Sequence, residues 1–364
     1  MASATNTIIL STIVVVLLMF SSASASRHDV TAIFAIGDST LDPGNNNHIG
    51  TLFVSNHPPY GCDFPGRVAT GRFTNGRLVT DVLSSHLGLK QFLPAYLDPA
   101  LKDEDLLTGV SFASAGSGID DETTVLAHLL SLESQVRNFK IALRRIERKI
   151  GPQEAKRIIN NALFVISSGT NDILNNFYWL PVSHRKLQFS LPQYHDFLLE
   201  RLENIIQDLH SLGARKFLVA GMPPTGCLPL QMTAGSIFPI FGPHTLQRRC
   251  VEQQNSDSQA YNVKLQALIT KLSSEVEEAK FAYADIYRPL MDIIQNPSKE
   301  GFDVSTEGCC GIGLVETGPL CLVLSPKCTN PSRYVFWDSI HPTEAAYSRI
   351  AEEIIKTTLP KLVT

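Results

Sequence analysis

The sequence lacks the features that mark a membrane-spanning or a nucleic-acid-binding protein. Beyond residue 20, no apolar run approaches the roughly 20 residues that a transmembrane helix needs. The 31 Lys and Arg residues are outnumbered by 35 Asp and Glu residues, so the net charge of -4 gives no reason to expect nucleic acid or an anionic membrane as a partner. We find no internal repeat, no low-complexity block and no linker between domains. What is present is an ordinary globular composition over 364 residues, 44% hydrophobic and 18% charged.

Several motifs that would assign a chemistry are also missing. No pair of cysteines has the C-x-x-C spacing of common zinc sites. The dinucleotide-binding pattern G-x-G-x-x-G is incomplete after Gly116, because Asp121 stands where the third glycine would be. The G-x-S-x-G motif of α/β-hydrolases is absent, and its nearest miss places Ser111 in a predicted strand. We therefore predict an activity that needs no metal and no organic cofactor.

The first 25 residues have the pattern of a secretory signal peptide. An apolar run over residues 8–20 is too short to span a bilayer, and Ala23-Ser24-Ala25 matches an A-x-A cleavage site. Residues 1–7 hold no Lys or Arg, which is unusual for a signal, and an uncleaved membrane anchor is the alternative. We predict a cleaved signal over residues 1–25 and a single domain over residues 26–364. The protein would then be secreted and extracellular, without stable membrane insertion.

Seven cysteines occur in the chain, and an exported protein meets an oxidising compartment in which disulfides form. Because seven is odd, at least one thiol is left over or pairs with another chain. Four of the seven lie between Cys309 and Cys328 among Gly and Pro residues, which predicts a loop closed by disulfides. A zinc site is the alternative for these four. The sequence fixes neither the connectivity nor the oligomeric state.

Short apolar runs alternate with helical patterns along the chain. Such alternation is typical of a parallel sheet covered by helices on both faces, and it predicts a three-layer α/β fold. The five predicted strands begin at residues 32, 109, 162, 216 and 281. Helical patterns cover residues 132–161 with a break near 151–152, residues 194–212, residues 245–280, and the chain from residue 342 onward.

Ser39, Gly116 and Asn171 each follow the carboxyl end of a predicted strand. Because sites in parallel sheets form beyond this edge, we expect these three residues to lie together. A serine hydroxyl becomes an effective nucleophile only when a base lies within hydrogen-bond reach and a further group orients that base. Asp338 and His341, three residues apart just before the last predicted helix, supply both.

Acyl transfer also needs preset donors for the negative charge that develops on the carbonyl oxygen. Gly116 can offer a backbone N–H that no side chain covers, and Asn171 can offer a side-chain amide. Each signal alone has an ordinary structural explanation as a βα turn, a tight turn, a helix N-cap or the turn before a helix. We interpret Asp38 and Asp172, which flank the proposed site, as residues that shape turns. The aromatic segment 177–180 is predicted either to line an acyl-binding groove or to cover the edge of the sheet.

Taken together and in this order, the segments resemble the GDSL esterase/lipase family of the SGNH-hydrolase group, and most closely its plant secreted branch. The four family blocks correspond to Gly37-Asp38-Ser39, residues 109–118, Gly169-Thr170-Asn171-Asp172 and Asp338-Ser339-Ile340-His341-Pro342-Thr343. Smaller pieces with the same resemblance are residues 42–47, 64–65, 71–76, 223–227 and 334–338. The resemblance covers essentially the whole chain after the signal. One departure is Thr40, where the family pattern has Leu.

The resemblance implies a flavodoxin-like sheet and names the roles. Ser39 would be the nucleophile, His341 the base and Asp338 the group that orients the base. The oxyanion hole would consist of the Ser39 N–H, the Gly116 N–H and the Asn171 side chain. Thr40 is not itself catalytic, so we expect the chemistry to survive its departure from the pattern.

We therefore predict a secreted serine esterase or lipase that hydrolyses carboxylic esters through an acyl-serine intermediate. Its substrate would be a small-molecule, lipid or cell-wall ester. An acyltransferase that passes the acyl group to a sugar or alcohol is one alternative. A catalytically silent binding protein of the same fold is another. The sequence gives neither the acyl chain length nor the alcohol.

Overall fold

A computed structural model describes residues 30–125, 127–179, 182–237 and 248–363. The predicted signal peptide, residues 1–25, lies outside the described residues. Five strands form one sheet in the order β2-β1-β3-β4-β5, and every neighbouring pair is parallel. This is the flavodoxin-like strand order. The strands are β1 (Ile33–Gly37), β2 (Gly109–Ser111), β3 (Leu163–Ser167), β4 (Lys216–Ala220) and β5 (Lys280–Ala284).

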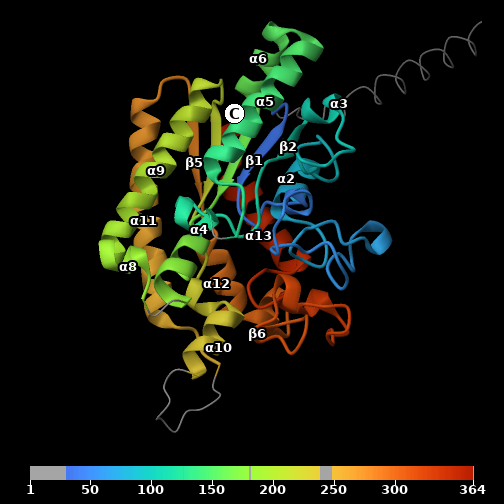
Figure 1. Ribbon diagram of the computed structural model, residues 1–364, viewed down its shortest axis with the longest axis vertical. Coiled ribbons are helices and arrows are strands. Elements are labelled where there is room, and N and C mark those ends of the chain that lie inside the picture. The colour runs from blue at the N-terminus through green and yellow to red at the C-terminus, as the bar shows by residue number, and fades with distance from the viewer. Residues whose placement is uncertain (1–29, 126, 180–181, 238–247, 364) are drawn as a thin grey trace, which may run out of the picture.

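Helices cover both faces of the sheet. Successive side chains of a strand point to opposite faces, so each strand contributes to two cores. Phe34 and Ile36 belong to a core under α5 (Leu132–Ile150), α6 (Pro152–Asn161), α9 (Leu191–Ser211) and α11 (Glu252–Glu275). Ile33 and Ala35 belong to a second core under α2 (Val79–His86), α12 (Tyr287–Gln295), α13 (Glu344–Thr357) and α14 (Pro360–Val363). Figure 1 shows α9 and α11 side by side along one flank of the sheet. The predicted three-layer α/β fold is confirmed.

Local signals explain where the helices begin and end. Gly151, with φ +84°, separates α5 from α6, and Pro152 opens α6, so the predicted break near 151–152 is confirmed. The Thr343 hydroxyl accepts a hydrogen bond from the Ala346 N–H and caps α13. The long helix predicted over 245–280 is shorter. It spans Glu252–Glu275, because the chain leaves the helix there to enter β5 at Lys280.

A second, smaller region follows β5. Its two short strands, β6 (Val304–Gly308) and β7 (Tyr334–Phe336), pair in parallel and flank the cysteine-rich loop. Disulfides join Cys309 to Cys328 and Cys310 to Cys321, so the predicted disulfide-closed loop is confirmed and the zinc alternative for these four cysteines is wrong. Cys227 pairs with Cys250, and Cys62 is the free thiol. The remaining α-helices of the described residues are short: α3 (Asp103–Leu106), α4 (Asp121–Val125), α7 (Thr170–Ile173), α8 (His184–Gln188) and α10 (Pro229–Ile237). A π-helix follows α7 at Leu174–Trp179.

Among the described residues, no helix combines the length and the apolar character that crossing a bilayer would require.

Candidate active site

Ser39 lies in a tight turn at the carboxyl end of β1. The turn needs a glycine at Gly37, because its φ is +152° and a Cβ there would lie 1.9 Å from the Ser167 carbonyl oxygen. The Asp38 carboxylate accepts hydrogen bonds from the Thr40 N–H (3.0 Å) and the Thr40 hydroxyl (2.8 Å), which closes the turn. Burial raises the pKa of the Asp38 carboxyl despite these bonds. The serine is thus presented by a turn that backbone packing and local hydrogen bonds fix.

Gly116 lies in the loop that follows β2. Its φ of +82° belongs to the region that favours glycine, and a Cβ would lie 2.8 Å from the Phe53 ring. The preceding residue is held from both sides. The Ala115 N–H donates to the Asp42 carboxylate at 3.0 Å, and the Asn46 amide donates to the Ala115 carbonyl at 2.9 Å. The segment 42–47 therefore positions the glycine loop.

Asn171 lies in α7, directly after β3, and its side-chain amide donates to the Ser117 carbonyl at 2.9 Å. The neighbouring Asp172 carboxylate accepts from the Ile119 N–H (2.8 Å), the Asp120 N–H (3.0 Å) and the Thr123 hydroxyl (2.6 Å). Burial raises the pKa of Asp172 to about 7. These bonds tie the loop after β3 to the loop after β2, so Asp172 shapes the loops as interpreted from the sequence.

Two backbone donors at this edge have no partner. Within the described part of the chain, neither the Ser39 N–H nor the Gly116 N–H has a hydrogen-bond acceptor. Backbone N–H groups in folded proteins are nearly always paired. Donors left open beside a half-buried amide such as that of Asn171 suit the binding of a negatively charged oxygen.

Asp338 and His341 share one turn just before α13. The His341 Nδ1 lies 2.9 and 2.8 Å from the two Asp338 carboxylate oxygens. The same carboxylate accepts from the Ile340 N–H (2.9 Å) and the His341 N–H (2.7 Å). The turn therefore fixes the imidazole against its carboxylate, and it assigns the Nδ1 proton to this contact.

The Asp338 carboxylate is fully buried and receives two further donors. The Tyr60 hydroxyl donates to its Oδ2 at 2.7 Å, and the Thr317 hydroxyl donates to the same oxygen at 3.2 Å. Burial raises the pKa of this carboxyl, but the nearby His341 and the backbone donors outweigh it, so the pKa lies below its usual value. Asp338 is thus a buried anion that faces the histidine.

The two segments meet at the serine. The Ser39 hydroxyl donates to His341 Nε2, with an Oγ–Nε2 distance of 2.7 Å. The Ser39 and His341 residues are 7% and 4% exposed, so the contact lies at the floor of a cleft, largely shielded from water. The structure thus brings together every residue that the sequence singled out: Ser39, Gly116, Asn171, Asp338 and His341.

Two cavities adjoin this contact. An open cleft of about 450 Å³ contains Ser39, Gly116, Asn171 and His341, and its walls are largely apolar. The apolar wall residues include Phe53, Trp179, Leu230, Val315 and Leu320. A narrower cavity of about 90 Å³ lies between the sheet and α13 and also reaches Ser39. Ligand sites in proteins are commonly apolar clefts with a few convergent polar groups, and the larger cleft has this character.

Comparison with known proteins places the chain in a family. Residues 33–354 match the family described as GDSL-like Lipase/Acylhydrolase. The chain belongs to this family of ester hydrolases. In Arabidopsis thaliana, GDSL esterase/lipase At2g40250 is 47% identical over 98% of this chain and 97% of that protein. GDSL esterase/lipase At2g30220 is 45% identical over 96% of each chain.

The structure explains the one departure from the family pattern. The Thr40 hydroxyl, which replaces the Leu of the GDSL name, donates to Asp38 and lies 3.1 Å from the Ser167 hydroxyl. The turn that presents Ser39 therefore gains polar contacts that a leucine could not make.

Sequence reasoning missed residues that support the site from other elements. Gln135 of α5 is fully buried and forms two hydrogen bonds with the backbone of Gly37, accepting from its N–H (2.8 Å) and donating to its carbonyl (2.9 Å). Tyr60 lies 278 positions before its partner Asp338. No sequence pattern distinguishes Gln135, on an amphipathic helix, or Tyr60, in a loop, from residues at the surface.

The aromatic segment 177–180 was predicted either to line an acyl-binding groove or to cover the edge of the sheet, and its residues differ in this respect. Trp179 lines the open cleft, as a groove residue would. Phe177 packs against Tyr194 of α9, with 4.9 Å between ring centroids, and belongs to the cover of the core. Leu180 lies outside the described residues.

Proposed function

We propose that this GDSL-family protein hydrolyses carboxylic esters through a covalent acyl-serine intermediate. The observation that carries the proposal is the continuous hydrogen-bonded line from Asp338 through His341 to the Ser39 hydroxyl. In the first step, Ser39 Oγ attacks the ester carbonyl carbon while His341 Nε2 takes the hydroxyl proton. His341 then returns the proton to the departing alcohol, and a water molecule resolves the acyl-serine by the reverse sequence.

The negative charge of each tetrahedral intermediate falls on the former carbonyl oxygen. The open Ser39 and Gly116 N–H groups and the Asn171 amide are the donors we propose for it. Because these donors are backbone groups or a tethered amide, they require little reorganisation when the charge develops. The buried Asp338 carboxylate would stabilise the imidazolium that forms in the same step.

The apolar walls of the open cleft support a hydrophobic acyl group as one side of the substrate. A chain of several carbons would lie along Phe53, Trp179 and Leu320, and the cavity of about 90 Å³ has space for only a small group. We further propose that residues 1–25 are a cleaved secretory signal and that residues 26–364 form one domain. The three disulfides are compatible with an extracellular location.

Replacement of the proposed nucleophile tests the mechanism. We expect Ser39→Ala to lower kcat by about 10⁵-fold or more on model esters, with an unchanged melting temperature, because the hydroxyl supplies the covalent step. Ser84→Ala is the matched control, since Ser84 is also a buried serine but lies in α2. We expect the control to retain the wild-type rate.

Labelling by a serine-reactive organophosphonate gives a second readout. An adduct on Ser39 of the wild type supports the proposal, whereas an unlabelled protein without esterase activity would favour a silent binding protein. Product analysis with a competing alcohol separates hydrolysis from acyl transfer. Ser39→Ala with activity within tenfold of the wild type would refute the covalent mechanism.

A further inference from the structure

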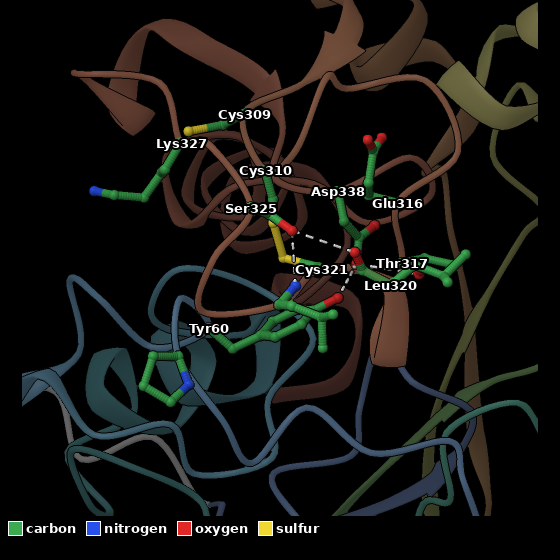
Figure 2. Close-up of a disulfide and its surroundings, with 12 residues drawn as sticks. Tyr60, Cys309, Cys310, Glu316, Thr317, Leu320, Cys321, Ser325, Lys327 and Asp338 are labelled. Atoms are coloured by element: carbon green, nitrogen blue, oxygen red, sulfur yellow. Dashed lines mark hydrogen bonds between the residues drawn. A yellow bond between two sulfur atoms is a disulfide. The ribbon is translucent and has the colours of Figure 1, made fainter.

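His341, the proposed base, is oriented by the Asp338 carboxylate. The groups around this carboxylate come from two distant parts of the chain. Asp338 Oδ2 accepts from Tyr60 of the N-terminal region and from Thr317 of the cysteine-rich loop. The Tyr60 hydroxyl also accepts from the Gly318 N–H at 2.7 Å. Because that N–H points at the phenol oxygen, the phenol proton is directed toward Asp338. Figure 2 shows Tyr60, Thr317 and Asp338 gathered beside the Cys310–Cys321 disulfide.

The loop that carries Thr317 and Gly318 is attached to the segment of Asp338 at several points. The Cys310 N–H donates to the Trp337 carbonyl at 2.8 Å, directly before Asp338. The Ser339 N–H donates to the Glu316 carbonyl at 2.8 Å, directly after it. The Cys310–Cys321 bridge closes the loop between these contacts. The donors to Oδ2 are therefore fixed relative to the backbone of Asp338 itself.

Tyr60 is also fixed as a ring. It is 1% exposed, and it packs edge-on against Phe73 (5.8 Å between centroids) and Trp337 (6.0 Å). Phe73 in turn contacts the His341 ring, with 4.9 Å between centroids. The phenol oxygen thus has a defined place in a rigid setting, and burial together with the adjacent Asp338 raises the pKa of Tyr60 far above its usual value. Tyr60 consequently stays a neutral donor at all working pH values.

We propose that Tyr60 is a positioning residue for the esterase reaction: its hydroxyl, aimed by the disulfide-closed loop, holds the Asp338 carboxylate in line with His341 and shares its negative charge. This inference rests on the proposed function. Without the phenol, Oδ2 would keep only the longer bond from Thr317 beside the imidazole, and the carboxylate would be freer to rotate. More of its charge would also act on His341, which favours the protonated imidazolium.

The test is Tyr60→Phe, which keeps the ring and its packing and removes only the hydroxyl. We expect kcat to fall about tenfold with KM within twofold, because the hydroxyl touches no substrate. We also expect the acid limb of kcat/KM to move to higher pH by about half a unit, since an imidazole beside a less shared carboxylate holds its proton more tightly. Thr317→Val should produce a smaller shift in the same direction.

Other ionisable groups near the triad are unchanged by this substitution. The buried Asp38 carboxyl interacts electrostatically with His341, and the buried Tyr347 lies near both Asp38 and Asp338. The matched control is Tyr194→Phe. Tyr194 is equally buried and donates to the Asp120 carboxylate at 2.9 Å, but that carboxylate is paired with Arg185 rather than with a histidine. We expect the control to leave the pH profile in place.

An NMR measurement, which requires no catalytic activity, tests the role of Tyr60 independently of the proposed function. In NMR spectra, the Tyr60→Phe variant should shift the resonance of the His341 Nδ1 proton, which lies in the contact with Asp338. If the wild type shows neither ester hydrolysis nor Ser39 labelling, the proposed function fails, and the Nδ1 proton resonance still tests the contact between Tyr60, Asp338 and His341. A Tyr60→Phe variant whose rate, acid limb and His341 Nδ1 proton resonance all match the wild type would overturn the positioning role.

Discussion

The two halves of the candidate site are held by different means. Ser39, Gly116 and Asn171 follow strands of a five-stranded parallel sheet that lies between two apolar cores. Asp338 and His341 lie beyond that sheet, next to a two-stranded ladder and a loop closed by two disulfides. The serine half owes its geometry to regular hydrogen bonding and burial of large apolar side chains. The histidine half is anchored by α13 in the second core, but the loop that faces Asp338 depends on covalent bridges and a few polar contacts.

The two halves are therefore sensitive to different perturbations. The loops at the edge of the parallel sheet rest on closely packed cores and move only when that packing changes. The serine half should therefore be disturbed only by changes that lower the stability of the whole fold. A small loop region with little apolar core depends on its cross-links. Conditions that cleave disulfides should therefore disturb Asp338 and His341, and conditions that weaken the cores should disturb the whole fold.

After replacement of Ser39 itself, the largest effect in the serine half should follow the loss of the proposed oxyanion donor Asn171. Asn171→Ala removes the side-chain amide while leaving Asp172 and its loop contacts, so we expect kcat to fall about 100- to 1000-fold with little change in melting temperature. Steady-state kinetics on a model ester measure the effect. A rate within threefold of the wild type would show that the Asn171 amide does not bind the developing charge.

A smaller effect should follow the loss of one bridge in the histidine half. We expect the double variant Cys310→Ser with Cys321→Ser to lower kcat by about 10- to 100-fold, because the donors to Asp338 lose their fixed place. The control is Cys227→Ser with Cys250→Ser. The Cys227–Cys250 bridge joins residues 23 apart rather than 11, so its removal should cost at least as much unfolding free energy.

Kinetics and thermal unfolding of both double variants decide the comparison. If activity merely follows stability, the control loses as much activity as the test variant or more. In that case the proposed difference between the two halves is wrong.

The smallest effect concerns stability of the helix-covered sheet in acid. His195 of α9 is 2% exposed, and neither ring nitrogen has a hydrogen-bond partner among the described residues. Burial, aided by Lys264, lowers the pKa of His195 to about 4, although Asp257 and Asp196 act in the opposite direction. The unfolded chain, with a usual histidine pKa near 6.5, binds more protons between these values, so stability falls as the pH drops from about 6.5 to 4.

Relative to pH 7.5, we expect His195→Phe to remove about 2 kcal/mol of this loss of stability at pH 5. This corresponds to about 3 °C in melting temperature. Thermal unfolding at the two pH values measures it. His48→Phe, which makes the same replacement at an exposed position, is the control and is measured at the same two pH values. An equal acid loss in wild type and His195→Phe would contradict the assignment.

The parts of the fold that sequence predicted are those with short-range signals. The apolar run over 32–36, the Gly151-Pro152 break and the cysteines between 309 and 328 each carry their structure within a few residues. The ends of the long helix were not predictable in the same way. Residues 276–280 have helix-compatible composition, and only pairing with β4 draws Lys280 into the sheet.

Sequence alone determined which groups are available for chemistry: a serine after one strand, a glycine turn after a second, an amide after a third, and a carboxylate three residues from an imidazole. Those assignments need only local spacing, because strand ends and tight turns are written in consecutive residues. The tertiary structure decided that Ser39 and His341, 302 positions apart, lie at 2.7 Å, and that Tyr60 and Gln135 support them. Such contacts arise when the chain packs its cores and closes its bridges, and no local pattern encodes which distant polar side chain will then be within reach.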